Sequence, residues 1–214
     1  MSGRVGNAWE RWVLPTLIET ACRGSTILEE RRRLVPRASG RVLEVGVGSG
    51  LNLPFYDQAH VSSLVAIDPS EGLLVKARAR AAESPLGARL ELRRSSAEQL
   101  PLPAESIDSV VMTYTLCSVA DPSRALQEIH RVLRPGGSVL FVEHGLASDE
   151  GTARWQRRIT PLWRRVSGNC HLDRDAAQAL RVAGFDLPEL AAGYSDGVVK
   201  ALSYTFEGVA VRRA

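Results

Sequence analysis

The sequence predicts an α/β fold with a doubly wound, mostly parallel sheet of seven strands, preceded by an N-terminal helix. Three observations support this: apolar runs alternate with helical spacing, the runs are apolar enough to be covered on both faces, and glycines follow the first run. The 214 residues are enough for one sizeable core and few for two. We therefore expect a single domain.

The N-terminal residues show helical spacing and predict a leading helix over 7–23. Their most apolar stretch, Trp12 to Cys22, is interrupted by Pro15 and Glu19 and is shorter than the roughly 20 residues that cross a bilayer. No apolar signal region with a cleavage site follows the start. We expect no stable membrane insertion and no secretion signal.

Seven apolar runs supply the predicted strands, and in chain order they are 41–45, 63–67, 89–92, 107–113, 138–142, 185–194 and 201–211. The last two flank Ser195-Asp196-Gly197, which predicts an antiparallel hairpin at the edge of the sheet. Ser70 can cap a helix that follows the second strand. Further helices are expected over 122–133, which ends at Arg134-Pro135-Gly136-Gly137, and over 174–183.

The charge balance argues against a nucleic-acid partner. The 27 Lys and Arg are interspersed with 24 Asp and Glu, for a net charge of +3. Arginine clusters occur at 31–33, 157–158 and 164–165, and we expect solvated helix faces, with contact to an acidic substrate or lipid headgroup as the alternative. The cysteines, Cys22, Cys117 and Cys170, are odd in number and widely spaced, which indicates reduced thiols in a cytoplasmic protein.

A glycine loop, Glu44-Val45-Gly46-Val47-Gly48-Ser49-Gly50, lies where the first strand ends and where a helix is expected to begin. Glycine lets the backbone turn sharply and approach a ligand, although a bare structural turn would also use it. A dinucleotide fingerprint needs another glycine at position 51, which is Leu51, and no Gly-Lys-Ser/Thr of a phosphate loop follows.

A glycine loop without a phosphate cradle suits a nucleoside whose other end is a zwitterion, with Glu44 placed to act on the ammonium group. Asp68 follows about 20 residues after Gly46, at the tip of the second strand, which is the offset at which an acid reaches ribose hydroxyls. Capping of the next helix by Asp68 is compatible with that role.

Three later segments complete the pattern: Ser96 to Pro101, Ser106 to Val111 and Leu133 to Gly137. With them the chain resembles the class I S-adenosylmethionine-dependent methyltransferases. The resemblance implies a Rossmann-like fold, S-adenosylmethionine as cofactor, S-adenosylhomocysteine as product, and an adenine site at Ala97 and Glu98. The implied cofactor-binding residues are Glu44, Gly46, Gly48, Gly50, Asn52, Asp68, Pro69, Ala97, Glu98 and Thr113.

Four strings narrow the resemblance: Gly50 to Tyr56, Thr115 to Val119, Val142 to His144, and Asn169 to Leu172. They resemble methyltransferase-like protein 7 and its soluble bacterial relatives. The animal members are thiol S-methyltransferases held to lipid by an N-terminal apolar segment, which here is only the broken stretch before Cys22. This chain also has Asn169 where a glycine is expected.

The resemblance divides the single domain into four parts: an N-terminal helical cover (1–37), a cofactor-binding core (38–143), a substrate-side insert (144–172), and a C-terminal helix with antiparallel strands (173–214). It implies methyl transfer to a small-molecule acceptor, with a small apolar thiol as our first choice, and no metal in the site.

The acceptor side is expected at the carboxyl edge of the sheet. His144 and His171 are candidate bases or orienting groups, and the alternative for each is a hydrogen bond to backbone. The candidate substrate contacts are aromatic: Trp9, Tyr114, Trp155 and Trp163. Simple core packing would explain the tryptophans equally well.

Three other functions remain open. The acceptor could be a phenol, an amine or a lipid headgroup instead of a thiol. Cys117 and Cys170 could converge and bind arsenite, although no vicinal cysteine pair supports this. A noncatalytic scaffold could retain the cofactor pocket. A thiol needs only modest activation because its pKa is near 8.5, whereas a phenol or an ammonium group needs a base.

Overall fold

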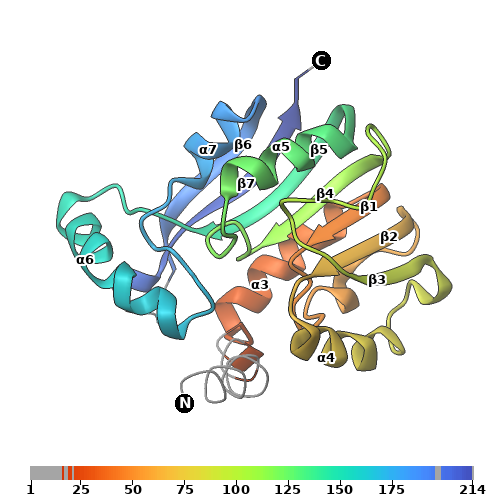
Figure 1. Cartoon of the computed structure of the whole chain (residues 1–214), viewed down its shortest axis with the longest axis horizontal. Coiled ribbons are helices and arrows are strands. Elements are labelled where there is room, and N and C mark those ends of the chain that lie inside the picture. Colours follow the sequence, from red (N-terminus) through yellow and green to blue (C-terminus); the bar gives the residue numbers. More distant parts are fainter. Residues whose placement is uncertain (1–15, 17–18, 21, 196–198, 214) are drawn as a thin grey trace, which may run out of the picture.

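Seven strands form one sheet in the order β3-β2-β1-β4-β5-β7-β6 (Figure 1). The computed structural model describes residues 16, 19–20, 22–195 and 199–213. The strands are β1 (Gly40–Val45), β2 (Val61–Asp68), β3 (Leu90–Arg94), β4 (Ile107–Thr113), β5 (Leu133–His144), β6 (Phe185–Tyr194) and β7 (Tyr204–Arg212). The first five run parallel, and β7 is antiparallel to both β5 and β6. The predicted fold class and its antiparallel edge are confirmed.

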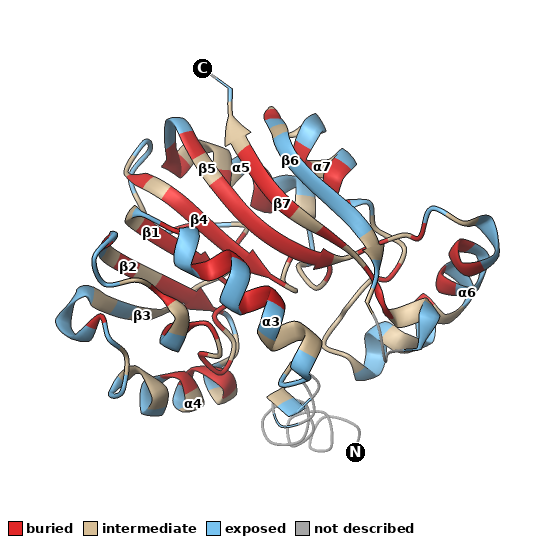
Figure 2. Ribbon diagram, turned by 180° about the vertical axis from the view of Figure 1, so that it is seen from behind, coloured by how far each residue is buried: buried red, intermediate tan, exposed pale blue. Residues whose placement is uncertain are grey.

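Helices cover both faces of the sheet. On one face, α3 (Ser25–Leu34) and α4 (Glu71–Ala81) pack against alternate residues of the central strands, and on the other face α5 (Pro122–Val132) and α7 (Ala176–Val182) do the same. Figure 1 shows α5 and α7 in front of the sheet, and the reverse view in Figure 2 shows α3 crossing it. Burial on both faces explains why the central strands are mostly apolar.

Side-chain caps mark the first turns of α4 and of the three helices that follow it. Ser70 accepts a hydrogen bond from the Leu73 amide, as the sequence predicted. Asp121, Asp149 and Asp175 cap α5, α6 (Glu150–Val166) and α7 in the same way. The predicted helix over 174–183 is therefore shorter, because Asp175 is its cap and Ala176 its first residue.

The prediction of an α-helix directly after the glycine loop is wrong. Gly50 is followed by turns and by a short 3-10 helix, η3 (Leu53–Phe55). Pro54 has no backbone N–H to donate and disfavours the helical conformation of the residue before it. Instead Leu53 and Tyr56 are buried beneath the sheet, in the same apolar cluster as Leu34 and Leu74.

Strand β5 begins five residues earlier than expected. Leu133 pairs with Ile107, and pairing resumes only at Ser138 with Ser109, so Arg134 to Gly137 form an irregularity in the ladder. Gly136 has a φ of 74°, a conformation that favours glycine. The predicted stop of α5 at this tetrapeptide holds, since α5 ends at Val132.

Most of the predicted leading helix over 7–23 lies outside the described residues, as do Asp196 and Gly197 of the predicted hairpin turn. The described Thr16, Glu19 and Thr20 are helical. In the described parts of the chain, every helix is too short or too polar to cross a membrane. Helix α6 occupies the predicted insert and lies beside the sheet (Figures 1 and 2).

Candidate active site

The candidate site lies at the carboxyl ends of β1 and β4, where chain connections leave in opposite directions. Such a switch point opens a crevice in parallel sheets. Two cavities of about 290 and 530 Å³ lie there. They share five lining residues, Gly46, Pro69, Thr115, Ser118 and Val119, so they form two parts of one elongated site.

The glycine loop forms one wall, and two of its glycines have different reasons to be glycine. Gly46 has a φ of 74°, and a Cβ there would lie 2.3 Å from the Thr115 hydroxyl oxygen. Gly48 has a φ of 55° and lines the first cavity, and a Cβ there would meet only the Gly46 carbonyl oxygen, at 4.0 Å. The Gly48 backbone therefore leaves room that a side chain would fill. Gly50 lines neither cavity and packs against Leu53 and Ala77.

Asp68 ends β2 and lines the first cavity, with 6% of its surface exposed. One carboxylate oxygen accepts a hydrogen bond from the Gly48 amide at 2.9 Å, and the other accepts from the Ser70 amide at 2.8 Å. Burial raises the pKa of Asp68, while the two amides act in the opposite direction. Each oxygen has a second lone pair, so Asp68 can accept further hydrogen bonds from a ligand.

The second cavity is lined by Ala97 and Glu98, the residues predicted for the adenine, and by Pro69, which was predicted to bind the cofactor. The Glu98 carboxylate also links two loops, because one oxygen accepts from the Ala120 amide at 3.0 Å and from the Asp121 amide at 3.2 Å. Burial alone would raise the pKa of Glu98, but the Ser96 hydroxyl and these amides lower it. Much of its hydrogen-bonding capacity is thus used within the chain.

Glu44 and Asn52 lie behind the first cavity and line neither cavity. The Glu44 carboxylate accepts from Asn52 Nδ2 and from the Tyr56 hydroxyl, both at 2.9 Å. Burial raises the pKa of Glu44 to about 7, against the effect of these two donors. Thr113 does line the first cavity, and its hydroxyl oxygen accepts from Asn52 Nδ2 at 3.0 Å.

Arg31 completes this network, and its predicted place on a solvated helix face is wrong. Its guanidinium donates from one nitrogen to Asn52 Oδ1 at 2.5 Å and to Thr113 Oγ1 at 2.9 Å. Arg31 is 5% exposed, lines the first cavity, and has no partner for its buried Nε. Its neighbours Arg32 and Arg33 are exposed. Ile27, Arg31 and Leu34 share one face of α3 by spacing, which is the signal that could have placed Arg31 inside.

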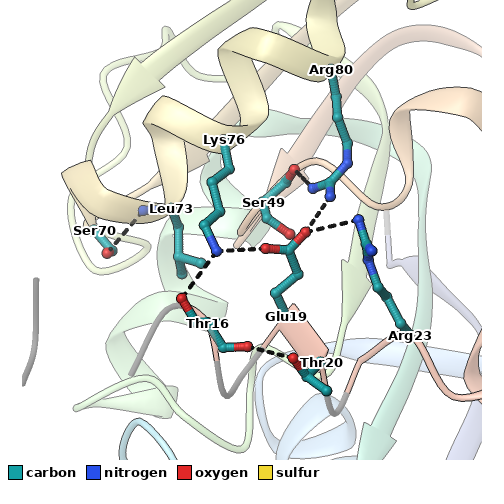
Figure 3. Close-up of polar contacts among 9 residues, drawn as sticks. All are labelled: Thr16, Glu19, Thr20, Arg23, Ser49, Ser70, Leu73, Lys76 and Arg80. Carbon is teal, nitrogen blue, oxygen red and sulfur yellow. Dashed lines mark hydrogen bonds and ion pairs between the residues drawn. The ribbon is translucent and has the colours of Figure 1, made fainter. Parts of the chain in front are cut away.

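The N-terminal segment is fastened over the glycine loop by Glu19 (Figure 3). Its carboxylate accepts from Lys76 Nζ at 2.6 Å, from Arg23 at 3.0 Å, and from Arg80, which also donates to the Ser49 carbonyl. Burial by itself raises the pKa of Glu19, but hydrogen bonds from Lys76 and Arg80 lower it to about 2. Glu19 and Cys22 both line the first cavity, so this segment forms part of its wall.

Tyr114 follows β4 and lines the first cavity in a left-handed conformation, with a φ of 58°. Its hydroxyl donates to the Glu30 carboxylate. Burial raises the pKa of Tyr114, and the Glu30 charge adds to the effect, so the phenol stays protonated. The ring meets the His144 ring edge to face, with centroids 4.6 Å apart.

Neither candidate histidine lines the two large cavities. His144 lines a third cavity of about 140 Å³, its buried Nδ1 has no partner, and burial lowers its pKa to about 4. His171 donates its backbone N–H to the Cys117 carbonyl at 2.8 Å, and its Nδ1 lies 3.8 Å from Asp173. The His144 ring thus meets the site through Tyr114, and His171 meets the loop after β4 through its backbone.

Of the three tryptophans predicted to contact the substrate, the structure describes Trp155 and Trp163. Trp155 is 62% exposed and lines none of the three cavities. Trp163 is half-buried on α6, and its buried indole nitrogen has no partner. Trp9 lies outside the described residues.

A single carboxylate, Glu143, holds the loop after β4. It is fully buried and accepts from the amides of Thr115 and Leu116, both at 2.8 Å, and of Cys117, at 3.2 Å. Burial raises the pKa of Glu143 to about 7, although the three amides favour its charged form. Glu143 lies in the string Val142 to His144, but nothing in the sequence marks it as a functional residue.

Cys117 and Cys170 converge, an arrangement that the sequence left open. Their sulfur atoms lie 3.7 Å apart, within hydrogen-bond distance for sulfur. Asn169 and Arg174 fasten this segment by donating to the carbonyls of Ser118, Leu116, Cys117 and Val119. The hydrogen bond between the thiols lowers the pKa of Cys170 and raises that of Cys117. In the described part of the chain, no group of three or more His, Cys, Asp or Glu side chains is arranged to hold a metal ion.

Comparison with known proteins identifies relatives of the core and of the whole fold. A methyltransferase domain family matches residues 43–141. A phosphatidylethanolamine N-methyltransferase of Cereibacter sphaeroides is 37% identical over 150 residues, which are 69% of this chain and 70% of that protein. The thiol S-methyltransferase TMT1B of Rattus norvegicus is 33% identical over 154 residues, which are 70% of this chain and 61% of that protein.

This chain thus spans about three fifths of the length of the thiol S-methyltransferase. Among solved structures, a methyltransferase of Thermotoga maritima matches with a TM-score of 0.67 and 22% identity, covering 97% of this chain and 99% of that one. Likeness at this level of identity shows the fold alone.

The thiol pair predicts a difference in reactivity. Because the thiolate is the nucleophile, Cys170 should be alkylated by iodoacetamide at neutral pH roughly tenfold faster than Cys117, which is buried and keeps its proton. Cys117→Ala should move the alkylation profile of Cys170 to higher pH, since the hydrogen bond that lowers its pKa is lost. Peptide mapping by mass spectrometry measures both rates, and equal rates for the two cysteines would contradict this ordering.

Proposed function

Because the chain belongs to the class I S-adenosylmethionine-dependent methyltransferases, we propose that it transfers the methyl group of this cofactor to a small apolar thiol. When bound, the cofactor supplies a methyl group already activated on a sulfonium sulfur. The protein's task is then to align the acceptor with that methyl group and to exclude water.

The observation that carries the choice of a thiol is the state of the ionisable groups around Tyr114. The Tyr114 phenol is held protonated by burial and by Glu30, and the adjacent His144, with a pKa of about 4, is neutral and a weak base at pH 7. A thiol with a pKa near 8.5 is partly ionised at that pH and needs little assistance. A phenol or an ammonium group, with a pKa near 10, needs a stronger base.

We place the cofactor's nucleoside across the two large cavities. Asp68 has lone pairs free for ribose hydroxyls, and Pro69, Ala97 and Glu98 line the second cavity, where the adenine would lie. The room beside Gly48, which a Cβ would fill, fits a ligand held close to backbone.

The amino-acid end of the cofactor is assigned to the region of Arg31. Its unpaired Nε is a buried donor beside the first cavity, and a carboxylate would satisfy it with a charge-assisted hydrogen bond. Asn52 and Thr113 orient the guanidinium, and Glu44 holds Asn52 in turn. In this arrangement Glu44 acts on the cofactor through other side chains.

A second candidate function is N-methylation of an amine headgroup. The 37% identity to a phosphatidylethanolamine N-methyltransferase, which this chain matches over 70% of that protein, favours it. An ammonium acceptor must lose a proton before it attacks. The candidate base is the Glu30 carboxylate, which accepts from the Tyr114 hydroxyl and whose own pKa is raised by burial.

Gly48→Val should abolish cofactor binding, because the new side chain would occupy room that the ligand needs. Gly87→Val is the matched control, since Gly87 has a similar φ of 52°, its added Cβ would meet nothing within 4 Å, and it is exposed at the start of a short 3-10 helix (Gly87–Arg89). Both variants should lose on the order of 1–2 kcal/mol of stability from the left-handed backbone. Calorimetric titration with S-adenosylmethionine should show wild-type affinity only in the control, and equal losses in the two variants would contradict the placement.

Asp68→Ala should weaken cofactor binding by about 1.5 to 3 kcal/mol, because it removes an ionised acceptor from the ribose hydroxyls. Asp57→Ala is the control, since Asp57 also accepts from a nearby backbone amide, that of Ala59, but lines none of the three cavities. The measurement is calorimetric, on protein whose folding is checked by circular dichroism. Unchanged affinity in folded Asp68→Ala would remove the ribose assignment.

The acceptor is tested with a matched thiol, phenol and amine on one hydrocarbon frame, together with phosphatidylethanolamine vesicles, across pH 6 to 9. The thiol rate should rise with pH as its thiolate fraction grows and level off near the thiol's own pKa. No step from His144 is expected in this range, because its pKa of about 4 leaves it neutral throughout.

His144→Ala and His171→Ala separate a base from a positioning role. Loss of a base lowers the rate more at neutral than at high pH, and loss of positioning lowers it equally at both. Methylation of the amine or the vesicle lipid alone would overturn the thiol proposal and leave the cofactor assignment intact.

A further inference from the structure

Helix α6 is attached to the fold by a small and polar face, which reverses the usual pattern of a surface helix. Its buried residues are Thr152, Ala153, Gln156 and Thr160. The Gln156 amide fixes the helix, since it accepts from the Ala147 amide at 2.8 Å and donates to the carbonyls of Gly145 and Ala201 at 3.0 and 3.1 Å. The attachment leaves three large apolar side chains of α6, Trp155, Leu162 and Val166, exposed.

Those large side chains point outward. Trp155, Leu162 and Val166 are 62%, 67% and 47% exposed, and their spacing of seven and four residues places them on one stripe of the helix. A single exposed apolar residue needs no explanation, but three on one stripe of a helix are a candidate binding surface. Figure 2 shows the exposed outer side of α6 beside the sheet.

The same exposed surface is strongly basic. Five arginines of α6 are exposed, Arg154, Arg157, Arg158, Arg164 and Arg165, and none of them forms an ion pair with a described acidic side chain. The helix contains one acidic residue, Glu150, in its first turn. The apolar stripe and the exposed arginines thus lie together on α6.

We propose that α6 docks on an anionic lipid surface, with Trp155, Leu162 and Val166 at the boundary between headgroups and acyl chains and the arginines on the phosphates. Tryptophan beside aliphatic residues and arginines is the composition of helices that lie in this interface. The helix docks in the plane of the membrane and does not cross it. The proposal goes beyond methyl transfer and does not depend on the identity of the acceptor.

Charge decides between a lipid surface and a second copy of this chain. In a two-fold contact centred on α6, the same patch would meet itself and oppose arginines to arginines. An anionic membrane neutralises these charges, and each basic residue near it adds to the binding.

Docking through α6 would place the site next to the lipid. The helix ends at Val166, Gly168 lines the first cavity, and Asn169 and Cys170 contact the loop after β4. An apolar acceptor dissolved in the membrane would then reach the site without crossing water.

The test is co-sedimentation of the full chain with vesicles of phosphatidylcholine alone or with about a third phosphatidylglycerol. At about 0.1 M salt the wild type should partition onto the anionic vesicles at least about tenfold more strongly, and 1 M salt should remove the difference, because the Debye length falls from about 10 to about 3 Å. Trp155→Ser with Leu162→Ser, and separately Arg158→Glu with Arg165→Glu, should each lower partitioning about tenfold.

Helix α7 supplies the matched controls, since Arg181 and Val182 are both exposed there, Val182 at 81%. Arg181→Glu and Val182→Ser should bind as the wild type does, and thermal melting checks that every variant is folded. Tryptophan emission should shift to shorter wavelength on vesicle binding, and Trp155→Phe should lose that shift.

Three results would overturn the proposal: equal binding to the two kinds of vesicle, equal losses in the α6 and α7 variants, or no binding at all. A concentration-dependent dimer without vesicles that the α6 substitutions abolish would assign the stripe to a second copy instead. None of these measurements requires methyl transfer, so they are independent of the proposed function.

Discussion

The candidate site depends on one buried carboxylate, Glu143, at the end of β5. It collects three consecutive amides of the loop after β4 and thereby fixes the backbone from Thr115 to Cys117. That loop supplies Thr115, Ser118 and Val119 to both large cavities. A buried amide left without an acceptor costs about 1–3 kcal/mol, so loss of this carboxylate would release the wall of the site.

The loop in turn positions the chemistry around it. Tyr114 precedes it in a left-handed conformation, with its hydroxyl on Glu30 and its ring against His144. Cys117 within it meets the segment that follows α6, through the Cys170 thiol and through the His171 amide. The two large cavities, the thiol pair and the base of α6 are therefore one connected structure.

A second buried network of side chains lies behind the first cavity, next to the glycine loop. Arg31, Asn52, Thr113 and Glu44 connect α3, the turn before η3, β4 and β1. Arg31 donates to neutral groups and keeps its buried Nε unpaired, which costs stability. Above the loop, Glu19 fastens the N-terminal segment to α4, so the first cavity is closed from two sides.

The sequence by itself determined the elements whose signals are local. Apolar runs gave the seven strands because burial on both faces demands them, Ser70 marked a helix start, and the glycines at 46 and 48 marked a close backbone approach. Local spacing also placed Asp68 at the tip of β2 beside that loop.

Only the tertiary structure decided which charged side chains are buried and which cysteines meet. Arg31 belongs to a basic run; its spacing from Ile27 and Leu34 puts it on their face of α3, but only the packing of that face against the sheet buries it. Cys117 and Cys170 are far apart in the chain and meet because the segment after α6 folds back onto the loop after β4. Pro54 replaced the expected helix with a 3-10 turn, which put Asn52 and Tyr56 on Glu44. Pairings between distant segments depend on how helices pack across the sheet, and no periodicity within a single segment carries that information.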